Sequence, residues 1–597
     1  QYYHSPLNQI LQTFFAPYLK PEWAPKPCDL LDLTEEIHSR VTQSQSQKIA
    51  KVGRLKWISP YELLQHGIST KSLESWRAKG WLLPSPETFS LNSAIHTLNP
   101  HQREAFAQLT FVGFGVHLLQ GITGSGKTEV YLHAMLKILQ QGKRVLMMVP
   151  EIGLTPQTHR RLAKAIHCPV VMIHSQINPQ LRGHLWSLLQ TNTPMIVLGT
   201  RSSVMTDIPN LGLIIIDEEH DASFVHDQGN HYDARHVALF RAKHLDIPVI
   251  MGSATPSLQA MDNAKKAKYH WIKLEHRHHQ PMPSLSVIDC RGHRLSNGLA
   301  PATQSLLVDL VKRQKQQVLL FLNRRGYAPV TLCHECGFHQ QCPDCDAHMT
   351  YHQAKNALIC HHCQRHMPFQ ETCSQCQQTS IINVGVGTEQ LALACQHLLP
   401  DATIVRIDRD TAQRSKQLDQ LTQSIISGDA NVLIGTQMIA KGHDFPFLNH
   451  VIMVDIDQGF YASDYRANEH LAQMVMQVSG RCGRHQQPGS VYLQTYVPHH
   501  PMIAMLIKHE YTPIAEYLLA EREQYHLPPF SHHASITAKA RYVDDVLNTL
   551  KRLIPYLNHP QVQCFGPVPL VGVKRKGEYR YQLLITSAHR SSLHQAL

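Results

Sequence analysis

Residues 115–139 read GVHLLQGITGSGKTEVYLHAMLKIL, in which a glycine-rich loop separates an apolar run from a helical pattern. The loop, GITGSGKT (121–128), fits G-x4-G-K-T in the strand, loop and helix context that this motif requires. In such a loop, backbone N–H groups turn towards phosphate oxygens, the lysine reaches the β and γ phosphates, and the threonine ligates Mg2+. A chance match would instead leave Lys127 as a solvated surface lysine. The predicted nucleotide-binding residues are Gly121, Thr123, Gly124, Ser125, Gly126, Lys127 and Thr128.

A second motif, LIIIDEEH (213–220), argues against a chance match. It is an apolar strand that ends in carboxylates, which predicts that Asp217 holds the metal and that Glu218 polarises the attacking water. An acidic helix start after a strand would explain either carboxylate alone, but not the combination. We therefore expect ATP hydrolysis, with ATP and Mg2+ as cofactors. The LSGGQ signature of ABC transporters is absent from the sequence, which makes an ABC transporter ATPase a weaker alternative.

From about residue 98 onwards, short apolar runs alternate with helical segments. Continuous apolar strands joined by helical crossovers are typical of a parallel sheet that is covered on both faces. A Pro- and His-rich joint at 276–283 divides the runs into two sets. The first set lies at 144–150, 195–200, 213–217 and 248–255, and the second at 317–323, 402–408, 431–437, 450–455 and 490–496. The sequence therefore predicts an α/β fold with two tandem RecA-like lobes.

Smaller domains are expected around the two lobes. Two short helical patterns between residues 59 and 82 predict a winged-helix domain, with a protein-docking spacer as an equal alternative. A cysteine-rich stretch is too long for a simple loop and predicts an inserted module. The expected boundaries are 1–23 for one helix cut from what precedes it, which the family resemblance given below implies is the tail of a truncated N-terminal DNA-binding domain, 24–84 for the winged helix, 85–97 for a linker, 98–283 and 284–497 for the lobes, 332–381 for the insertion, and 498–597 for an α+β C-terminal domain that binds DNA or partners.

The composition favours a polyanionic partner. With 597 residues, the chain is long enough for about four domains. Lys and Arg outnumber Asp and Glu by 56 to 45, which gives a net charge of +11 and favours nucleic acid, although a protein charged merely for solubility would look the same. About a quarter of the histidines would be protonated at pH 7, so affinity for nucleic acid should fall as pH or salt rises.

Targeting signals are not visible in the sequence. No apolar run approaches the roughly 18 residues that a spanning helix needs, so no membrane partner is expected. Without a secretion signal, a cytoplasmic location is expected. The chain begins at Gln1 rather than Met and ends without a clear stop signal, so a fragment is expected.

Eight of the 14 cysteines fall between residues 333 and 376, in four C-x2-C pairs. Paired thiolates without a secretion signal favour zinc over disulfides, and eight of them predict two closed, structural sites. The four pairs can combine in three ways. The 14-residue gap suits a zinc-ribbon hairpin, so we predict a nested arrangement. The inner site is Cys342, Cys345, Cys360 and Cys363, and the outer site is Cys333, Cys336, Cys373 and Cys376. The neighbouring histidines, His334, His361, His362 and His366, are expected at the surface rather than as ligands.

The later motifs resemble those of superfamily 2 helicases throughout 98–497. NPHQ (99–102) resembles the adenine-reading Q motif, with Gln102 in that role. QVSGRCGR (477–484) resembles motif VI, which implies that Arg481 and Arg484 stabilise transition-state charge from the second lobe. A solvated, Arg-rich turn is the alternative. Further resemblances are VPEIGLTPQ (149–157) to motif Ia, GTRSS (199–203) to Ib, GSATP (252–256) to III, FLNRRG (321–326) to IV and GTQMIAKGHDFP (435–446) to V.

Together with FLNRRGYAP (321–329) and the four cysteine pairs, these motifs resemble one family, the bacterial replication-restart helicases PriA, or primosomal protein N′. The resemblance implies a monomeric, DNA-stimulated helicase that moves 3′ to 5′ on forked and single-stranded DNA. It also implies partners, namely single-strand DNA-binding protein and other primosome proteins, and a location at the nucleoid. Of the family's N-terminal domain, which grips the 3′ end of the nascent leading strand, only the last helix is expected here.

Three further segments are expected to touch DNA. Backbone amides and hydroxyls at Thr200, Arg201, Ser202 and Thr436 are candidates for holding phosphates. The family resemblance implies that an aromatic-rich loop, here 222–235, senses single strands by stacking; His231 stands where the family usually has Trp, which weakens stacking. The stretch VKRKGEYRYQ (573–582) suits a strand held by charge and stacking, or equally a sheet edge protected by lysines.

Two other functions stay open on the sequence alone. A fork-binding scaffold would use the zinc module and winged helix while hydrolysis is incidental. An RNA helicase would share the core motifs.

Overall fold

The computed structural model describes most of the chain from residue 97 onwards. Before that it describes residues 31–33 and 82–84. Beyond residue 97 the gaps are 151–154, 167, 176, 178, 192, 227–230, 277–281, 294, 323–329, 334–339, 341, 344–348, 353–356, 360–364, 380, 385–386, 408–423, 437–444, 462–463, 481 and 484–488. The chain divides into two compact units, Gln1–His279 and Gln280–Leu597.

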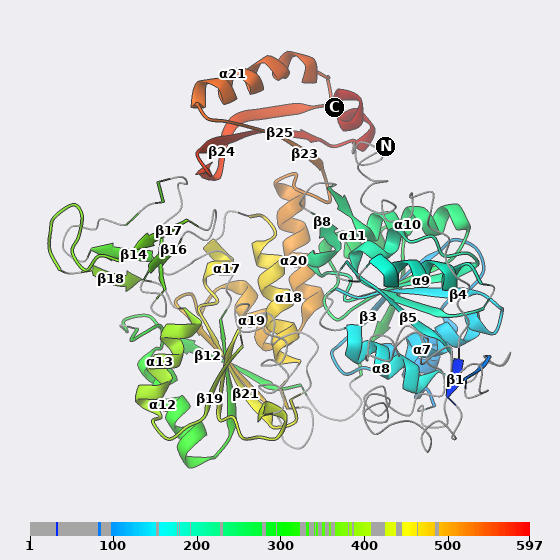
Figure 1. The fold of residues 1–597 in the computed structure, drawn as a ribbon, viewed down its shortest axis with the longest axis horizontal. Coiled ribbons are helices and arrows are strands. Elements are labelled where there is room, and N and C mark those ends of the chain that lie inside the picture. Colours follow the sequence, from blue (N-terminus) through cyan, green and yellow to red (C-terminus); the bar gives the residue numbers. More distant parts are fainter. Residues whose placement is uncertain are drawn as a thin grey trace. The chain divides into compact units, whose positions relative to one another are not determined.

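The first lobe is a parallel sheet with helices on both faces, as predicted (Figure 1). Within the described residues its strand order is β11-β3-β10-β7-β4-β6-β5. The strands are β3 (Val116–Gly121), β4 (Arg144–Met148), β5 (Val170–Ile173), β6 (Ile196–Gly199), β7 (Leu211–Asp217), β10 (Val249–Ser253) and β11 (His270–Leu274). The helices are α6 (Pro100–Ala107), α7 (Lys127–Leu139), α8 (Thr155–Ala165), α9 (Pro179–Leu189), α10 (Ala234–Leu245) and α11 (Leu258–Lys265). The two edge strands, β5 and β11, were not predicted from the sequence.

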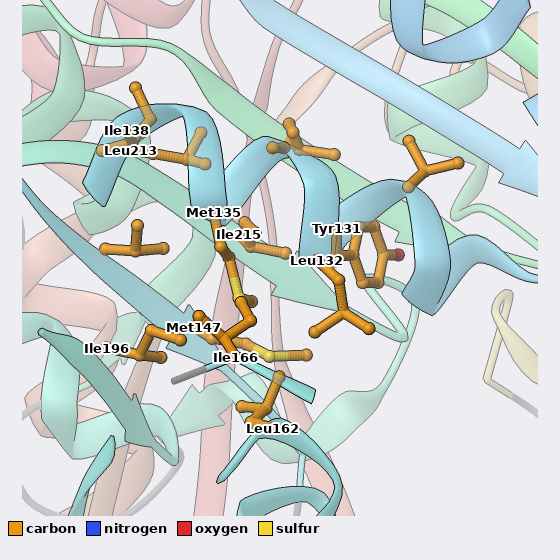
Figure 2. Close-up of a cluster of buried hydrophobic side chains, with 14 of the residues drawn as sticks. Tyr131, Leu132, Met135, Ile138, Met147, Leu162, Ile166, Ile196, Leu213 and Ile215 are labelled. Atoms are coloured by element: carbon orange, nitrogen blue, oxygen red, sulfur yellow. The ribbon is translucent and has the colours of Figure 1, made fainter. Parts of the chain in front are cut away.

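The core of this lobe forms where α7 and α8 pack on the sheet. Figure 2 shows Leu132 and Met135 of α7 facing Met147 of β4 and Leu162 of α8. All are essentially inaccessible to solvent, and burying a side chain of this size contributes about 1.5–3 kcal/mol. Because α7 begins at Lys127, this packing also fixes the loop that precedes it.

The second lobe is also a parallel sheet. Its strand order in the described residues is β12-β22-β21-β13-β20-β19. The strands are β12 (Ser284–Asp289), β13 (Gln317–Leu322), β19 (Ile404–Ile407), β20 (Val432–Gly435), β21 (Leu448–Val454) and β22 (Ser490–Thr495). The accompanying helices are α12 (Pro301–Val308), α13 (Thr388–Leu398), α17 (Gln458–Tyr461) and α18 (Ala467–Ser479). The predicted two-lobed α/β class is therefore confirmed.

The cysteine-rich insertion contains two small antiparallel sheets. Strands β14 (Val330–Cys333) and β18 (Ile381–Val384) pair at its base, with Cys333 opposite Ile381. Strands β15 (Thr350–His352), β16 (Ala357–Ile359) and β17 (His366–Pro368) form the other sheet (Figure 1). The β15–β16 hairpin occupies the 14-residue gap where the sequence predicted one.

Two helices after the second lobe, α19 (Pro501–Ile507) and α20 (Tyr511–Gln524), pack against α18. Arg522 Nη2 of α20 lies 2.7 Å from Glu469 Oε2 of α18, and both side chains are buried. The Arg522 guanidinium also stacks 5.0 Å from the centre of the Tyr465 ring. A charged contact thus joins α20 to the helix that leads into Arg481.

The last part of the chain is a three-stranded antiparallel sheet in the order β23-β25-β24. Its strands are β23 (His532–Ala540), β24 (Gln563–Arg575) and β25 (Glu578–Ser587). Helices α21 (Val543–Leu553) and α22 (Arg590–Ala596) pack against it, with a core that includes Leu550 and Leu583. The predicted α+β C-terminal domain is present.

Before residue 97 the structure describes one strand pair, β1 (Leu31–Leu33) with β2 (Leu82–Pro84). The predicted N-terminal helix at 1–23, the helices of the winged-helix domain and the 85–97 linker up to residue 96 lie outside the described residues.

Candidate active site

The glycine-rich loop curls over the C-terminal end of β3. Ser125 N donates to the carbonyl of Ile122 at 3.0 Å, and Gly124 and Gly126 have φ values of +87° and +84°. This left-handed backbone favours glycine, which explains both positions in the motif. Lys127 Nζ donates to the Gly121 carbonyl at 2.7 Å, so its ammonium lies over the loop.

Gln102 connects this loop to the start of α6. Its side chain and that of Asn99 form a reciprocal capping box, with distances of 3.0 and 2.8 Å to the two backbone N–H groups. Gln102 Nε2 also donates to the Ser125 carbonyl at 3.1 Å. The side chain that the sequence predicted to read adenine is therefore buried and holds the phosphate loop to its neighbouring helix.

Asp217 ends β7, is half-buried and lies against the buried Tyr131 of α7. The Tyr131 hydroxyl donates to Asp217 Oδ1 at 3.1 Å. Burial and the charge of Glu218 raise the pKa of the Asp217 carboxyl to about 6, while Lys127 opposes the rise. Asp217 and Lys127, far apart in sequence, are thus close enough in the fold for their charges to interact.

Glu218 follows with an unusual backbone, at φ +49°. A non-glycine residue in this region is strained, and such strain often occurs at functional sites. Its Oε2 is buried and has no hydrogen-bond partner within the described residues, and His220 Nδ1 lies 3.7 Å away. His220 Nδ1 instead contacts Ser253 Oγ at 2.7 Å, which links this turn to the end of β10.

Ser125 Oγ in the phosphate loop is likewise buried without a hydrogen-bond partner among the residues that the structure describes. Two buried polar atoms, one on the loop and one on Glu218, are thus left unsatisfied at one edge of the sheet. Such atoms normally find a partner, so they fit a polar ligand bound here. The donor set suits a nucleotide, since the loop offers backbone N–H groups and a lysine, and suits Mg2+, since Asp217 and Thr128 offer oxygens.

Glu219 links this edge of the sheet to Ser257 and Arg235. It is buried and accepts from Ser257 N at 3.0 Å and Ser257 Oγ at 2.6 Å. Arg235 Nη1 donates to the Glu219 carbonyl at 2.8 Å, and its guanidinium pairs with Asp233 at 2.6 Å. Arg235 thereby attaches the end of the 222–235 loop directly to the acidic motif.

The two legs of the 222–235 loop are described, except for residues 227–230. Phe224 and Tyr232 are buried rather than presented for stacking, whereas His231 is exposed. Ser223 Oγ donates to the Pro150 carbonyl at 2.7 Å. The aromatic side chains on which the stacking prediction relied therefore pack inside the lobe in this structure.

Arg201, a predicted phosphate contact, also points at this loop. Its Nη1 donates to the carbonyls of Ser223 at 3.1 Å and Val225 at 2.5 Å. Thr200, which caps the 3-10 helix η2 (Arg201–Met205), is buried. Ser202, the second residue of η2, is half-buried.

In the second lobe, Arg481 and Arg484 lie outside the described residues. Their neighbours Cys482 and Gly483 are described. Cys482 is fully buried, and its Sγ donates to the Asn449 carbonyl at 2.8 Å. Gly483 N donates to the Leu448 carbonyl at 3.2 Å. The chain next to Arg481 is thus anchored to the start of β21, and Thr436 follows the end of β20.

Four zinc-ligand candidates, Cys336, Cys345, Cys360 and Cys363, fall outside the described residues. Among the residues that the structure describes, no three candidate ligands come together as a metal site. Cys342 and Cys373 are buried, and Gln375 N donates to Cys373 Sγ at 3.4 Å, within the turn that leads to Cys376. His366 is exposed on β17, which fits its predicted surface position.

Several residues of the site were not predicted from the sequence. Tyr131, Arg235 and Ser257 have no local signal, because their contacts join segments 16 to 86 residues apart. Glu219, His220 and Ser253 stand inside motifs that the sequence analysis quoted without giving these residues a role.

Four family models match the chain. They are a DEAD/DEAH box helicase domain over residues 99–264, a helicase conserved C-terminal domain over 367–486, a PriA DNA helicase Cys-rich region domain over 342–368, and a primosomal protein N C-terminal domain over 523–597. No helix among the described residues is long and apolar enough to cross a membrane.

Curated relatives agree with these matches. The chain is 42% identical over 507 residues to the replication restart protein PriA of Haemophilus influenzae, covering 84% of this chain and 69% of that protein. It is 36% identical to the protein of the same name from Bacillus subtilis, covering 80% of this chain and 60% of that protein. It is 32% identical to that from Rickettsia conorii, covering 95% of this chain and 86% of that protein. Among solved structures, RecG bound to a three-way DNA junction is similar at a TM-score of 0.43 and 17% identity, covering 81% of this chain and 52% of RecG. On its own motifs and on these relatives, the chain belongs to the PriA family of replication restart proteins.

Proposed function

We propose that this chain is an ATP-driven DNA helicase that moves 3′ to 5′, acts at stalled or collapsed replication forks and restarts replication through primosome assembly. The observation that supports it most is the edge of the first sheet, where a phosphate-type loop, Lys127, Asp217 and an unsatisfied Glu218 meet. Bound Mg-ATP supplies the phosphoryl group whose hydrolysis drives movement.

The predicted residues have distinct roles in this proposal. The N–H groups of residues 121–128 and the Lys127 ammonium hold the phosphates, and Thr128 and Asp217 hold Mg2+. Glu218 orients the attacking water and accepts its proton. Gln102 keeps the loop in place from α6 and contacts adenine. Arg481 and Arg484 stabilise the charge that develops on the transferred phosphoryl group.

The accessory parts are proposed to engage DNA and proteins. The eight cysteines hold two zinc ions, with Cys342, Cys345, Cys360 and Cys363 as the inner set. The protein acts as a monomer in the cytoplasm, at the nucleoid, on forked and single-stranded DNA, together with single-strand DNA-binding protein and other primosome proteins. Relatives named replication restart proteins support this assignment.

The basic hairpin at 573–582 is proposed as a contact for single-stranded DNA. Lys574 Nζ lies 5.5 Å from the centre of the Tyr579 ring across the β24–β25 pair. The same ammonium is 3.5 Å from the carbonyl of Pro343, between two zinc-ligand candidates. Because β24 is an edge strand, protection of that edge by lysines is the competing explanation.

ATP hydrolysis measured with single strands, duplexes, forked DNAs and RNA tests the proposal. We expect DNA, and forks in particular, to raise the rate, and Lys127→Ala to abolish both hydrolysis and unwinding. Unchanged unwinding in that variant would favour a fork-binding scaffold, and stimulation by RNA rather than DNA would favour an RNA helicase. A rate that ignores every polynucleotide contradicts the proposal.

A further inference from the structure

Arg201 makes an unusual set of contacts for a residue in a DNA-binding motif. One of its two terminal nitrogens, Nη1, is shared between the carbonyls of Ser223 and Val225. Both belong to the outgoing leg of the 222–235 loop, which comprises residues 222–226. The Arg201 guanidinium also acts on Tyr232, on the returning leg at 231–235, where its charge opposes the rise that burial causes in the pKa of that phenol. One guanidinium thus holds the outgoing leg directly, and it reaches the returning leg through its charge and through Val225, which pairs with Asp233.

The outgoing leg has a second attachment. Ser223 Oγ donates to the Pro150 carbonyl, just past the end of β4. Val225 pairs with Asp233 in the short strand pair β8 (Val225–His226) and β9 (Tyr232–Asp233). The base of the loop is therefore held by residues that follow two different strands of the sheet, Pro150 after β4 and Arg201 after β6.

Both legs lead directly to the hydrolytic motif. On the outgoing side, Ser223 N donates to Asp221 Oδ1 at 2.8 Å, and Asp221 N donates to the Glu218 carbonyl at 2.9 Å. On the returning side, Asp233 pairs with Arg235, whose guanidinium donates to the Glu219 carbonyl. A short series of hydrogen bonds thus connects each leg to the turn that contains Glu218, the residue with the strained backbone. A displacement of either leg would therefore be transmitted to Glu218.

We propose that Arg201 is a positioning residue that clamps the two legs of the 222–235 loop and so transmits DNA binding to hydrolysis, rather than a ligand of DNA phosphate. The inference rests on the proposed DNA-stimulated ATPase. An arginine suits this clamp because its planar fork reaches several acceptors at once, whereas a lysine ammonium offers a point charge.

A phosphate ligand and a clamp give different results when the arginine is removed. Loss of a phosphate contact weakens DNA binding and lowers the salt slope of the affinity by about 0.7 for a single strand, yet saturating DNA restores full stimulation. Loss of a clamp leaves affinity and salt slope in place and lowers the stimulation that saturating DNA produces.

The test measures ATPase rates with no DNA and with saturating oligothymidylate, and measures DNA affinity by fluorescence anisotropy across a salt series. For Arg201→Met we expect the ratio of stimulated to unstimulated rate to fall by about fivefold, which is within the range for residues that carry coupling. The affinity and its salt slope should match those of the unchanged protein. Arg201→Lys should give an intermediate ratio.

Two further variants keep the test sharp. Ser223→Ala removes the other attachment of the same leg with little change in volume, so it should lower the ratio as well, and the double variant should be less than additive. Arg241→Met is the matched control. Arg241 Nη1 also bridges two carbonyls, those of Val204 and Thr206 at 3.0 and 2.6 Å, but it holds η2 and leaves the loop untouched.

Three outcomes would overturn the inference. An Arg201→Met protein with weaker binding, a smaller salt slope and full stimulation at saturation makes Arg201 a phosphate ligand. An equal fall of the ratio in Arg241→Met means that loosening η2 is sufficient. Unaltered stimulation by DNA in both Arg201→Met and Ser223→Ala shows that Arg201 does not act as a clamp. A protein without the substitutions that shows no DNA stimulation refutes the proposed function itself, which is a separate result.

Discussion

Gly252 and the Tyr131 hydroxyl lie in direct contact at the end of β10. A Cβ atom added at Gly252 would overlap the Tyr131 hydroxyl and come within 2.7 Å of Tyr131 Cζ. Tyr131 is fully buried and cannot move aside, and its hydroxyl is the donor to Asp217. The glycine of the GSATP motif therefore makes room for the side chain that orients the predicted metal ligand.

We expect Gly252→Ala to abolish ATP hydrolysis, because overpacking typically costs about 1–3 kcal/mol and here displaces the hydrogen bond to Asp217. Adding Tyr131→Phe removes the overlapping oxygen and should recover thermal stability in part, but not the rate. Melting temperature and ATPase rate measured on the two variants check this. Full activity in Gly252→Ala would contradict the contact.

His117 of β3 predicts a pH effect on stability. Burial, followed by the charge of His270, lowers the pKa of its imidazole from 6.5 to about 4, although a hydrogen bond with the Thr110 backbone opposes the shift. Between those values the unfolded chain binds a proton that the folded chain excludes, so stability is lost as pH falls from 6.5 towards 4. Above pH 6.5 the effect is absent.

His117→Gln, which retains an acceptor for Thr110 N, should therefore lose less stability than the unchanged protein when pH falls from about 7 to 5. The fall in melting temperature between these two pH values, compared for both proteins, is the measurement. Parallel falls would show that His117 does not titrate as its burial indicates.

At the scale of elements, the contact of α18 with α20 depends on a buried ion pair. Removing one partner of such a pair leaves an uncompensated charge and costs about 3–5 kcal/mol. Arg522→Met should lower the free energy of unfolding of the second unit by this amount, measured by urea titration. Arg313→Met, which breaks the exposed pair with Asp309 at 3.2 Å, is the control and should cost about 1 kcal/mol or less. Equal losses would contradict the role assigned to burial.

The zinc module is a second case at this scale. Within the part of the module that the structure describes, its three-stranded sheet has a small core of Cys342, Met349 and Leu358, with Met367 and Phe369 packed against it. So small a core rarely holds strands of this length, so the metal should supply the missing stability. Chelation should therefore abolish amide protection in residues 342–368 and leave both parallel sheets protected, as measured by hydrogen exchange. Metal analysis should give two zinc ions per chain, and a single ion would contradict the nested arrangement.

At the scale of the whole molecule, the positive charge predicts how DNA binding responds to salt and pH. With a net charge of +11, affinity for a single strand should fall by at least about tenfold between about 50 and 200 mM salt. Lowering the pH should strengthen binding, but by less than 42 freely titrating histidines would give. Burial lowers the pKa of several imidazoles and keeps them neutral, among them His174, His450, His500, His532 and His533. Anisotropy titrations across salt and pH check both trends, and a flat salt response would argue against phosphate contacts.

Features that depend on neighbouring residues could be predicted from the sequence. The phosphate loop was visible because glycine spacing and the lysine are local, and most strands of both sheets were visible because continuous apolar runs mark buried parallel strands. Edge strands β5, β11 and β12 escaped this pattern. The cysteine spacing likewise predicted the hairpin that separates Cys345 from Cys360.

Which distant side chains share a site depends on the packing of the fold and could not be predicted from the sequence. Tyr131 reaches Asp217 across 86 residues, and Arg201 reaches Ser223 and Val225 across more than 20. The sequence predicted phosphate contacts for Arg201 and adenine recognition for Gln102, yet packing gives both side chains intramolecular partners. The reason is physical: a motif fixes the chemistry of a side chain, whereas its partner depends on how strands and helices far apart in the chain pack together.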